Sequence, residues 1–341
     1  MALSDYVNTF GRHLLKRHGE RVHKLAINAG FTCPNRDGSK GRGGCTFCNN
    51  SSFSPNVSSG TKRGRDKRPE GTVPVNAGKE PDVLEQIESG RRVLAKRTGA
   101  KKFLAYFQAY TNTYDDPLKL KARYDSALAE PDVLGLAIGT RPDCVPPKVL
   151  DLLAAYRDQG YEVWLELGLQ SAFDHTLQRV NRGHGFAEYR DAVAAARERG
   201  LPVCTHLIVG LPGEEPIHNL FSLERVLDLG VEGLKLHPLH VVKGTMLANQ
   251  WRRHEYTPWM MQEYVKVVAD MVERTPPEVI YHRLTGTAEE RLLLAPGWCS
   301  WKWRVLNAIE RELARRGTCQ GYGIDKNTST QRRKDAEVAE V

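Results

Sequence analysis

The 341-residue sequence lacks the long apolar runs that cross membranes: none reaches about 18 residues, so we expect no contact with a membrane. Its first residues, Met1-Ala-Leu-Ser-Asp-Tyr-Val-Asn, contain no basic stretch followed by an apolar one, and no secretory signal is expected. Cysteine is scarce and odd in number, with seven residues in the chain, which argues against a disulfide scaffold. These absences together predict a cytoplasmic protein.

The composition is typical of a globular protein, with 26% charged and 40% hydrophobic residues. A chain of this length holds one large α/β domain or two ordinary ones, and neither an internal repeat nor a separated second domain is evident. The formal net charge of +8 favours a polyanionic partner, although many basic proteins bind none.

Short apolar runs alternate with amphipathic segments along most of the chain. Strands are expected at His23–Ala29, Lys102–Phe107, Leu134–Gly139, Glu162–Leu167, Val203–Val209 and Gly233–Pro238. Helical patterns include Asp82–Arg97, Pro147–Asp158, Phe186–Glu198 and Ile217–Leu229. Strict alternation of strand and helix indicates parallel βαβ units. Six such units, with Val279–Arg283 as a candidate seventh strand, predict an α/β fold that forms a full or partial (β/α) barrel.

The same patterns divide the chain into a core and its extensions. Residues 1–22 are expected to form an N-terminal extension, 23–245 the barrel core, and 246–325 a C-terminal helical extension that covers the barrel. Within the core, residues 51–80 are rich in glycine, serine, proline and basic residues, and they are predicted to form a flexible insertion. This insertion carries the basic run Lys62–Arg68. The polar tail 326–341 is predicted to be disordered.

The cysteines Cys33, Cys45 and Cys48 follow the first expected strand, in a loop that contains four glycines. Glycines let such a loop fold back, so that the three sulfurs can converge on one centre. Structural zinc and ordinary [4Fe–4S] clusters take four protein ligands, whereas three thiolates leave one iron of a cluster open for a small molecule. That arrangement is the one a radical S-adenosylmethionine (SAM) site requires. Judged by themselves, the three cysteines fit a zinc site completed by a distant histidine about as well as they fit an iron–sulfur cluster.

Polar and glycine-rich motifs follow the expected strands. In a (β/α) barrel, active-site groups gather at the C-terminal ends of the strands. After the second to sixth strands come, in order, Gln108-Ala-Tyr-Thr-Asn-Thr113, Thr140-Arg-Pro-Asp143, Glu166 with Gln170, Gly210-Leu-Pro-Gly-Glu214, and His237 to Lys243. The sequence therefore predicts one functional rim, which the cysteine loop shares.

Taken together, these motifs resemble those of the YhcC-like radical SAM proteins, relatives of the Elongator catalytic subunit and of oxygen-independent coproporphyrinogen oxidase. The similarity runs from about residue 5 to about residue 320. Besides the cysteines, it is carried by Ala105-Tyr-Phe-Gln-Ala-Tyr-Thr-Asn-Thr113, Gly139-Thr-Arg-Pro-Asp143, Glu166-Leu-Gly-Leu-Gln-Ser171, Asn181-Arg-Gly-His184, His206-Leu-Ile-Val-Gly-Leu-Pro-Gly213 and Leu234-Lys-Leu-His-Pro238.

The resemblance implies a [4Fe–4S] cluster on the three cysteines, with SAM bound at the open iron. The residues that it implies for SAM are Gln108, Tyr110, Thr111 and Asn112 near the amine, Glu166 and Gln170 at the ribose, Arg182 at the carboxylate, and Gly210, Pro212 and Gly213 near the adenine. The loop at Gln108 departs from the Gly-Gly-Glu form common among relatives. Alternatives remain for Arg182 and for Gly210–Gly213, which are also typical of ordinary turns. A buried carboxylate at Glu166 favours a functional role, because it needs a partner.

Substrate contact is expected from polar side chains at the later strand ends, although a lone histidine in a strand is more often a core residue. The candidates are Arg141, Asp143, His206, Lys235, His237, His240 and Lys243. The implied reaction begins when a donor such as a flavodoxin or ferredoxin reduces the cluster, which cleaves SAM to methionine and a 5′-deoxyadenosyl radical.

Three substrate hypotheses follow. The first is transfer RNA, favoured by the Elongator relationship, the net charge and the basic run. The family resemblance implies a 5-substituted wobble uridine, with removal of the carboxymethyl part of a carboxymethylaminomethyl group as the reaction. The second is a small molecule with coproporphyrinogen-like chemistry. The third belongs to another class, a zinc-stabilised RNA-binding module without radical chemistry.

Overall fold

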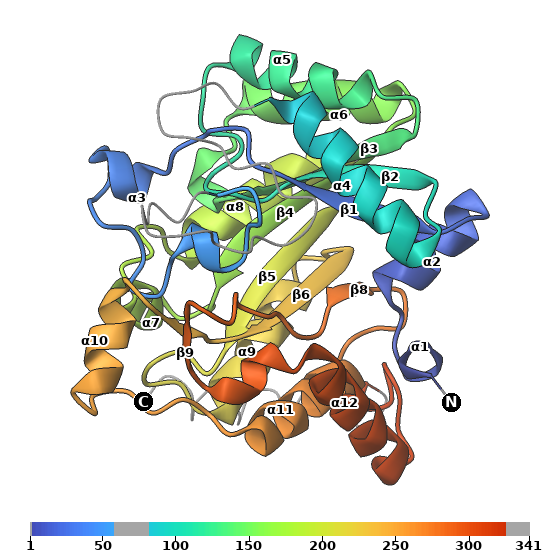
Figure 1. Ribbon diagram of the computed structural model, residues 1–341. Helices are drawn as coiled ribbons and strands as arrows, with labels where there is room; N and C mark the ends of the chain where they lie inside the picture. The colour runs from blue at the N-terminus through green and yellow to red at the C-terminus, as the bar shows by residue number, and fades with distance from the viewer. Residues whose placement is uncertain (1, 58–81, 325–341) are drawn as a thin grey trace.

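The structure is a computed structural model that describes residues 2–57 and 82–324. Seven parallel strands form one sheet in the order β1-β2-β3-β4-β5-β6-β8. The strands are β1 (Val22–Ile27), β2 (Lys102–Phe107), β3 (Val133–Thr140), β4 (Glu162–Gln170), β5 (Val203–Val209), β6 (Gly233–Pro238) and β8 (Ile280–Arg283). The sheet curves into a partial barrel whose two edge strands, β1 and β8, are not hydrogen-bonded to each other (Figure 1). The predicted α/β barrel is therefore confirmed in its partial form.

Helices cover the outer face of the sheet and bury its apolar side chains. The covering helices are α4 (Val83–Thr98), α5 (Pro117–Leu128), α6 (Pro147–Asp158), α8 (Phe186–Glu198), α9 (Pro216–Leu227), α11 (Met261–Glu273) and α12 (Lys302–Arg316). In Figure 1, α4 to α6 lie beside the first strands, and α9, α11 and α12 lie beside the last. Helices α5, α6 and α9 each begin at a proline, whose fixed φ and missing N–H suit the first helical turn.

The inner face of the barrel is apolar at the end where the strands begin. Helix α2 (Phe10–His18) closes this end. The inward side chains there form a small cluster with Phe10 and Leu14 of α2, which includes Leu104, Ala137, Trp164, Cys204 and Ile280. The Phe10 ring stacks on His282 of β8 with a centroid distance of 3.8 Å. The cavity that holds the candidate site consequently faces the other end of the barrel, where the strands terminate.

The N-terminal extension also lies along the outer edge of β8. Thr9 forms an isolated parallel bridge with Tyr281, and the Tyr281 N–H donates to the Asn8 carbonyl at 2.8 Å. On the inner side, Lys24 Nζ of β1 lies 3.1 Å from His282 Nδ1 of β8. Side chains and helix α2 therefore span the gap between the two edge strands.

Shorter elements surround the rim. They are α1 (Leu3–Tyr6), α3 (Pro34–Asp37), η1 (Asn50–Ser52), η2 (Pro142–Cys144), α7 (Asp174–Arg179), α10 (Met246–Arg252), η3 (Gly297–Ser300), and a two-stranded sheet of β7 (Val241–Val242) and β9 (Leu293–Ala295).

Part of the predicted flexible insertion is packed against the barrel. Ser54 and Asn56 are each only 2% exposed, and Asn56 Nδ2 donates to the Ala26 carbonyl of β1 at 2.8 Å. Residues 51–57 are thus held in place, contrary to the expected start of the insertion at residue 51. The basic run Lys62–Arg68 and the tail 326–341 lie outside the described residues.

Candidate active site

The C-terminal ends of the strands line a cavity of about 210 Å³, and the three cysteines lie in its wall. All three thiols are free of disulfides. Ten further residues singled out from the sequence share this lining: Gln108, Tyr110, Thr111, Arg141, Gln170, Arg182, His206, Lys235, His237 and His240. The cysteine loop, the ends of the second, third, fourth and sixth expected strands, and His206 within the fifth thus meet around one space.

Nitrogen donors surround the cysteine sulfurs. Arg182 Nη1 lies 3.6 Å from Cys45 Sγ, and Asn35 Nδ2 lies 3.8 Å from the same sulfur. Asn50 Nδ2 lies 3.7 Å from Cys48 Sγ. Such N–H···S contacts orient thiolate ligands and tune the reduction potential of an iron–sulfur cluster.

A fixed cation beside the cysteine loop, the Arg36 guanidinium, favours thiolate ligands. Burial raises the pKa of the Cys48 thiol to about 11 and Cys45 adds to the rise, while the nearby Arg36 guanidinium lowers it. Arg36 Nη2 also donates to the Cys48 carbonyl at 2.7 Å, which fixes this cation beside the loop. A buried thiol of this kind becomes a thiolate when a metal binds it, because coordination deprotonates it outright. Three free thiols, their N–H donors and a fixed cation match a three-cysteine cluster.

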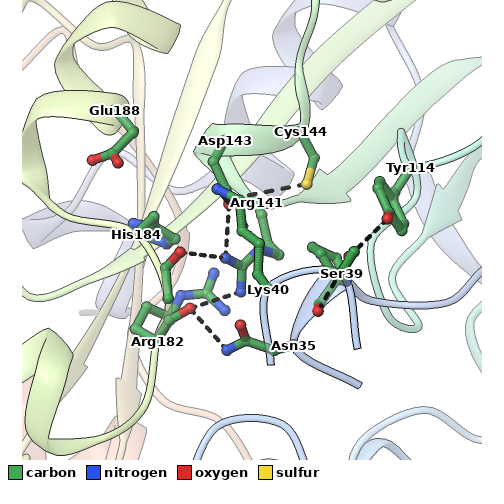
Figure 2. A network of polar contacts seen from close by, with 12 residues as sticks. Asn35, Ser39, Lys40, Tyr114, Arg141, Asp143, Cys144, Arg182, His184 and Glu188 are labelled. Carbon is green, nitrogen blue, oxygen red and sulfur yellow. Dashed lines mark hydrogen bonds and ion pairs between the residues drawn. The ribbon is translucent and has the colours of Figure 1, made fainter. Parts of the chain in front are cut away.

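Arg182 is held in place by a network of polar contacts, which Figure 2 shows together with Arg141 and Asn35. Its Nη2 donates to the Gly168 carbonyl at 2.5 Å, and its buried Nε has no partner among the described residues. Its own carbonyl accepts from Arg141 Nη1 at 2.7 Å and from Asn35 Nδ2 at 3.0 Å. The free Nε is consistent with the carboxylate contact that the sequence predicts for Arg182.

Arg141 and Asp143, which were expected to contact substrate, form the centre of this network. Arg141 Nε and Nη2 bind the two Asp143 oxygens at 2.9 and 2.8 Å, and Lys40 Nζ donates to Asp143 at 2.6 Å. Burial alone would raise the pKa of Asp143, but hydrogen bonds and charge from Arg141 and Lys40 hold it well below its usual range. Arg141 lines the cavity with little exposed surface, whereas Asp143 lies outside the lining. Arg141 also donates to the carbonyls of Arg182 and Gly183 and so positions this stretch of backbone. Substrate contact by Arg141 and Asp143 stays a prediction.

Two residues of the expected SAM-binding loops adopt left-handed backbone conformations. Tyr110 has a φ of 64° and Gln170 a φ of 83°, values that cost energy for residues with a side chain. The Tyr110 N–H donates to Asn50 Oδ1 at 2.9 Å, and Gln170 lies at an irregularity in the pairing of β4 with β5. Asn112 does not line the cavity. Its Nδ2 donates to the Gly139 carbonyl at 2.6 Å, and this bond helps to fix the conformation of the loop.

Glu166 lies beneath the cavity, fully buried, and does not line it. One carboxylate oxygen pairs with Lys24, and the other accepts from Lys235 Nζ at 2.5 Å and from His206 Nε2 at 2.9 Å. Burial would raise the pKa of Glu166, but Lys235, Lys24 and the two neighbouring histidines hold it well below its usual range. Protein groups therefore supply the partners that a buried carboxylate needs. The ribose contact assigned to Glu166 stays a prediction, and Gln170 is the member of that pair on the cavity wall.

The remaining candidates lie outside the cavity lining. Gly210 and Gly213 have φ values of 89° and 84° in the turn after β5. The Gly210 carbonyl accepts from Tyr256 Oη at 2.8 Å, and the Pro212 carbonyl accepts from Arg179 Nη1 at 2.9 Å. Lys243 is exposed beyond β7. Their roles toward adenine and substrate stay predictions.

Several cavity residues were missed by the sequence argument, among them Arg36, Asn50 and Arg283. Arg283 ends the candidate seventh strand, so the rule that placed the other rim residues could have found it. Arg36 and Asn50 flank the cysteines, but loop residues show no periodicity that separates inward from outward side chains.

Comparison with known proteins assigns the family. The Radical SAM superfamily matches residues 30–220, and the Radical_SAM C-terminal domain matches residues 231–315. Protein YhcC of Escherichia coli (strain K12) is 46% identical over 326 residues, which are 96% of this chain and 98% of that protein. The chain therefore belongs to the radical SAM superfamily and, within it, to the YhcC-like proteins. It is a radical SAM enzyme, of a superfamily that generally binds a [4Fe–4S] cluster and SAM, and the zinc-stabilised module is thereby set aside.

More distant relatives show the range of the superfamily. The tRNA uridine(34) acetyltransferase of Dehalococcoides mccartyi (strain CBDB1) is 33% identical over 168 residues, 48% of this chain and 36% of that protein. The solved structure of the archaeal Methanocaldococcus infernus Elp3 has a TM-score of 0.59 at 20% identity, covering 70% of this chain and 60% of that one. The latter likeness supports the fold. Among the described residues, no helix is both long and apolar enough to cross a membrane.

Proposed function

We propose that this enzyme modifies transfer RNA at a 5-substituted wobble uridine, by removing the carboxymethyl part of a carboxymethylaminomethyl group. SAM would be the two-electron oxidant and water the co-reactant, so that the carboxymethyl part leaves as glyoxylate, the amine stays on the uridine, and SAM ends as 5′-deoxyadenosine and methionine. The observation that carries the proposal is the single cavity in which the three cysteines and Arg182 face a wall of cationic and imidazole side chains. That wall suits an anionic group on the substrate. The similarity of half the chain to an enzyme named for tRNA uridine(34), and the net charge of +8, support RNA as its carrier.

In this proposal Cys33, Cys45 and Cys48 hold the [4Fe–4S] cluster, and Arg182 binds the carboxylate of SAM through its free Nε. Gln170 and the loop Gln108–Thr111 hold the rest of SAM from the opposite walls. When bound and reduced by a flavodoxin or ferredoxin, the cluster supplies the electron that cleaves SAM. The protein's own contribution is positioning: the barrel encloses the reacting groups and keeps the target hydrogen near the radical.

The substrate is tested by nucleoside analysis of transfer RNA from cells with and without the gene. We expect the carboxymethylaminomethyl nucleoside to accumulate in the deletion strain, and a plasmid copy to reverse the change. A plasmid copy with Cys45→Ala should fail to reverse it, whereas Cys319→Ala should succeed because this thiol is exposed and outside the cavity. Identical nucleoside profiles in all strains would contradict the RNA proposal and favour a small-molecule substrate.

The cofactor assignment has its own test. Protein reconstituted anaerobically should contain about four irons and four sulfides per chain. The same treatment of Cys45→Ala should leave little cluster absorption, and Cys319→Ala should match the unaltered protein. Stoichiometric zinc without cluster absorption would overturn the assignment.

A further inference from the structure

Three basic side chains and one carboxylate gather at the floor of the cavity. Lys24 and Lys235 both pair with Glu166, while Arg283 lines the cavity beside them. Lys235 of β6 and Arg283 of β8 are direct register partners on neighbouring strands. Lys235 already pairs with Glu166, and burial lowers the pKa of Lys235 to about 7. The charge that is left without an anion on these two strands is therefore that of Arg283.

Arg283 has no anionic partner in the described part of the chain. Its Nη1 contacts His237 Nε2 at 2.8 Å. Burial, followed by the charge of Arg283 and the presence of His240, holds the pKa of His237 well below its usual range, so that the ring is neutral and accepts this bond. A guanidinium carries five N–H donors in a rigid fork, and one imidazole leaves most of them available.

The two histidines on the same wall are neutral and do not compete with Arg283 for an anion. The His240 ring lies 5.8 Å from the His237 ring, and burial lowers the pKa of His240 to about 4. Both histidines line the cavity with Arg283 and Lys235. Gly286 packs against His237 so closely that a Cβ there would lie 1.9 Å from the ring, which keeps this imidazole in place. The wall therefore holds His237 in place, and the Arg283 guanidinium that donates to this ring keeps most of its N–H groups without acceptors.

We propose that Arg283, supported by Lys235, binds a carboxylate of the substrate at the floor of the cavity. One anion would satisfy the guanidinium fork and would offset the charge of Arg283. The inference rests on the proposed function for the identity of the group, since a carboxymethylaminomethyl substituent ends in a carboxylate. The carboxylate of SAM has the same chemistry, and the experiment separates the two sources.

Carboxylate binding can be measured without any transfer RNA. The cluster-loaded enzyme, saturated with SAM to fill the Arg182 site, is titrated with sodium acetate against sodium chloride at equal ionic strength while its Tm is followed. Acetate should raise the Tm, because a ligand that binds the folded state stabilises it. In Arg283→Gln the acetate affinity should fall at least about tenfold, and Arg283→Lys should be intermediate because lysine lacks the bidentate fork.

A matched control and the opposing results complete this test. Arg315→Gln changes an arginine on α12 whose side chain is 69% exposed, and it should respond to acetate like the unaltered enzyme. Equal acetate protection in Arg283→Gln and the unaltered enzyme would overturn the proposal. So would protection that vanishes in Arg182→Gln and persists in Arg283→Gln, because the carboxylate site would then be the one assigned to SAM.

Kinetics on transfer RNA from the deletion strain separate this inference from the proposed function. Arg283→Gln should raise KM at least about tenfold, with a smaller effect on kcat, since the group binds the substrate and does not react. If the unaltered enzyme modifies this RNA and Arg283→Gln does so equally well, the carboxylate site is wrong while the function stands. If acetate binds through Arg283 but the RNA is not modified, the site stands and the proposed substrate is wrong.

Discussion

Asp143 and Arg141 are two positions apart in the chain and almost completely enclosed, with side chains 3% and 2% exposed. Residues of this kind were expected at the substrate because charged groups on a rim favour function. In the structure Arg141 and Asp143 pair with each other, and Arg141 also donates hydrogen bonds to the carbonyls of Arg182 and Gly183. Charged residues can thus be functional through the backbone that they position.

Breaking this pair should be costly. In Asp143→Asn the Arg141 guanidinium keeps its charge but loses its carboxylate, and we expect a loss of about 3–5 kcal/mol in the free energy of unfolding. Urea denaturation measures it. Asp191→Asn is the matched control, because its partner Arg190 and Asp191 itself are 58% and 68% exposed, and such pairs contribute about 0–1 kcal/mol. Equal effects in the two variants would contradict the positioning role.

Glu214, in the turn after β5, should make stability depend on pH. Burial raises its pKa to about 7 from the ordinary 4.5, despite a hydrogen bond from Ser171 Oγ at 2.5 Å. Between these values the folded state binds more protons than the unfolded state, so this group's contribution to stability falls as pH rises through the window. By pH 8 the ionised carboxylate costs about 3 kcal/mol.

The prediction is checked with Glu214→Gln by urea unfolding at pH 4.5 and pH 8. The variant should gain up to about 3 kcal/mol relative to the unaltered protein between the two pH values, because glutamine does not ionise. A difference that is the same at both pH values would show that the carboxyl is not perturbed.

Among the elements, helix α2 is the one whose role the sequence concealed. Its residues were assigned to an extension, yet Phe10 is 7% exposed and closes the barrel at the end where the strands begin. We expect Phe10→Ala to cost about 3–5 kcal/mol of unfolding free energy, as for other buried phenylalanines. Leu15→Ala on the same helix is the control, since Leu15 is 44% exposed and should lose far less. Thermal and urea unfolding of both variants would decide whether α2 is part of the core.

The strands and covering helices were largely predictable because their periodicity is local. Strands β2, β5 and β6 and helices α6 and α8 have the bounds that the sequence predicts. The packing of helix α2 and of the short strands β7 and β9 was missed, since the segments that they contact are distant in the sequence. The cysteine loop could be recognised because its residue types and spacing carry the chemistry directly.

The internal pairing of the site could not be predicted. Lys24, Glu166, Lys235 and His282 come from β1, β4, β6 and β8, and they meet because the sheet curves until its two edges face each other. A strand pattern shows that each side chain points inward but does not show which inward side chains touch. The sequence therefore predicted that Glu166 is buried and could not reveal that lysines and histidines surround it. Its functional role stays a prediction.

For the molecule as a whole, the net charge of +8 predicts a measurable salt effect. The basic run Lys62–Arg68 is expected to contact the backbone of transfer RNA. Replacing its five cations with Gln or Ser should weaken RNA binding and flatten the dependence of log K on log salt by roughly 0.7–0.9 per lost contact. Filter binding at several salt concentrations measures the slope. An unaltered slope with unaltered RNA modification would remove the run from the mechanism.

The gap between β1 and β8 has a mechanical consequence. A closed barrel fixes its own radius, because every strand is bonded to two neighbours and the register must return to its start. An open barrel is free of that condition. It can widen or narrow while the hydrogen bonds between its neighbouring strands stay intact. The width of the cavity is consequently set by the parts that bridge the gap between β1 and β8, namely helix α2 and, on the inner side, the contact between Lys24 and His282.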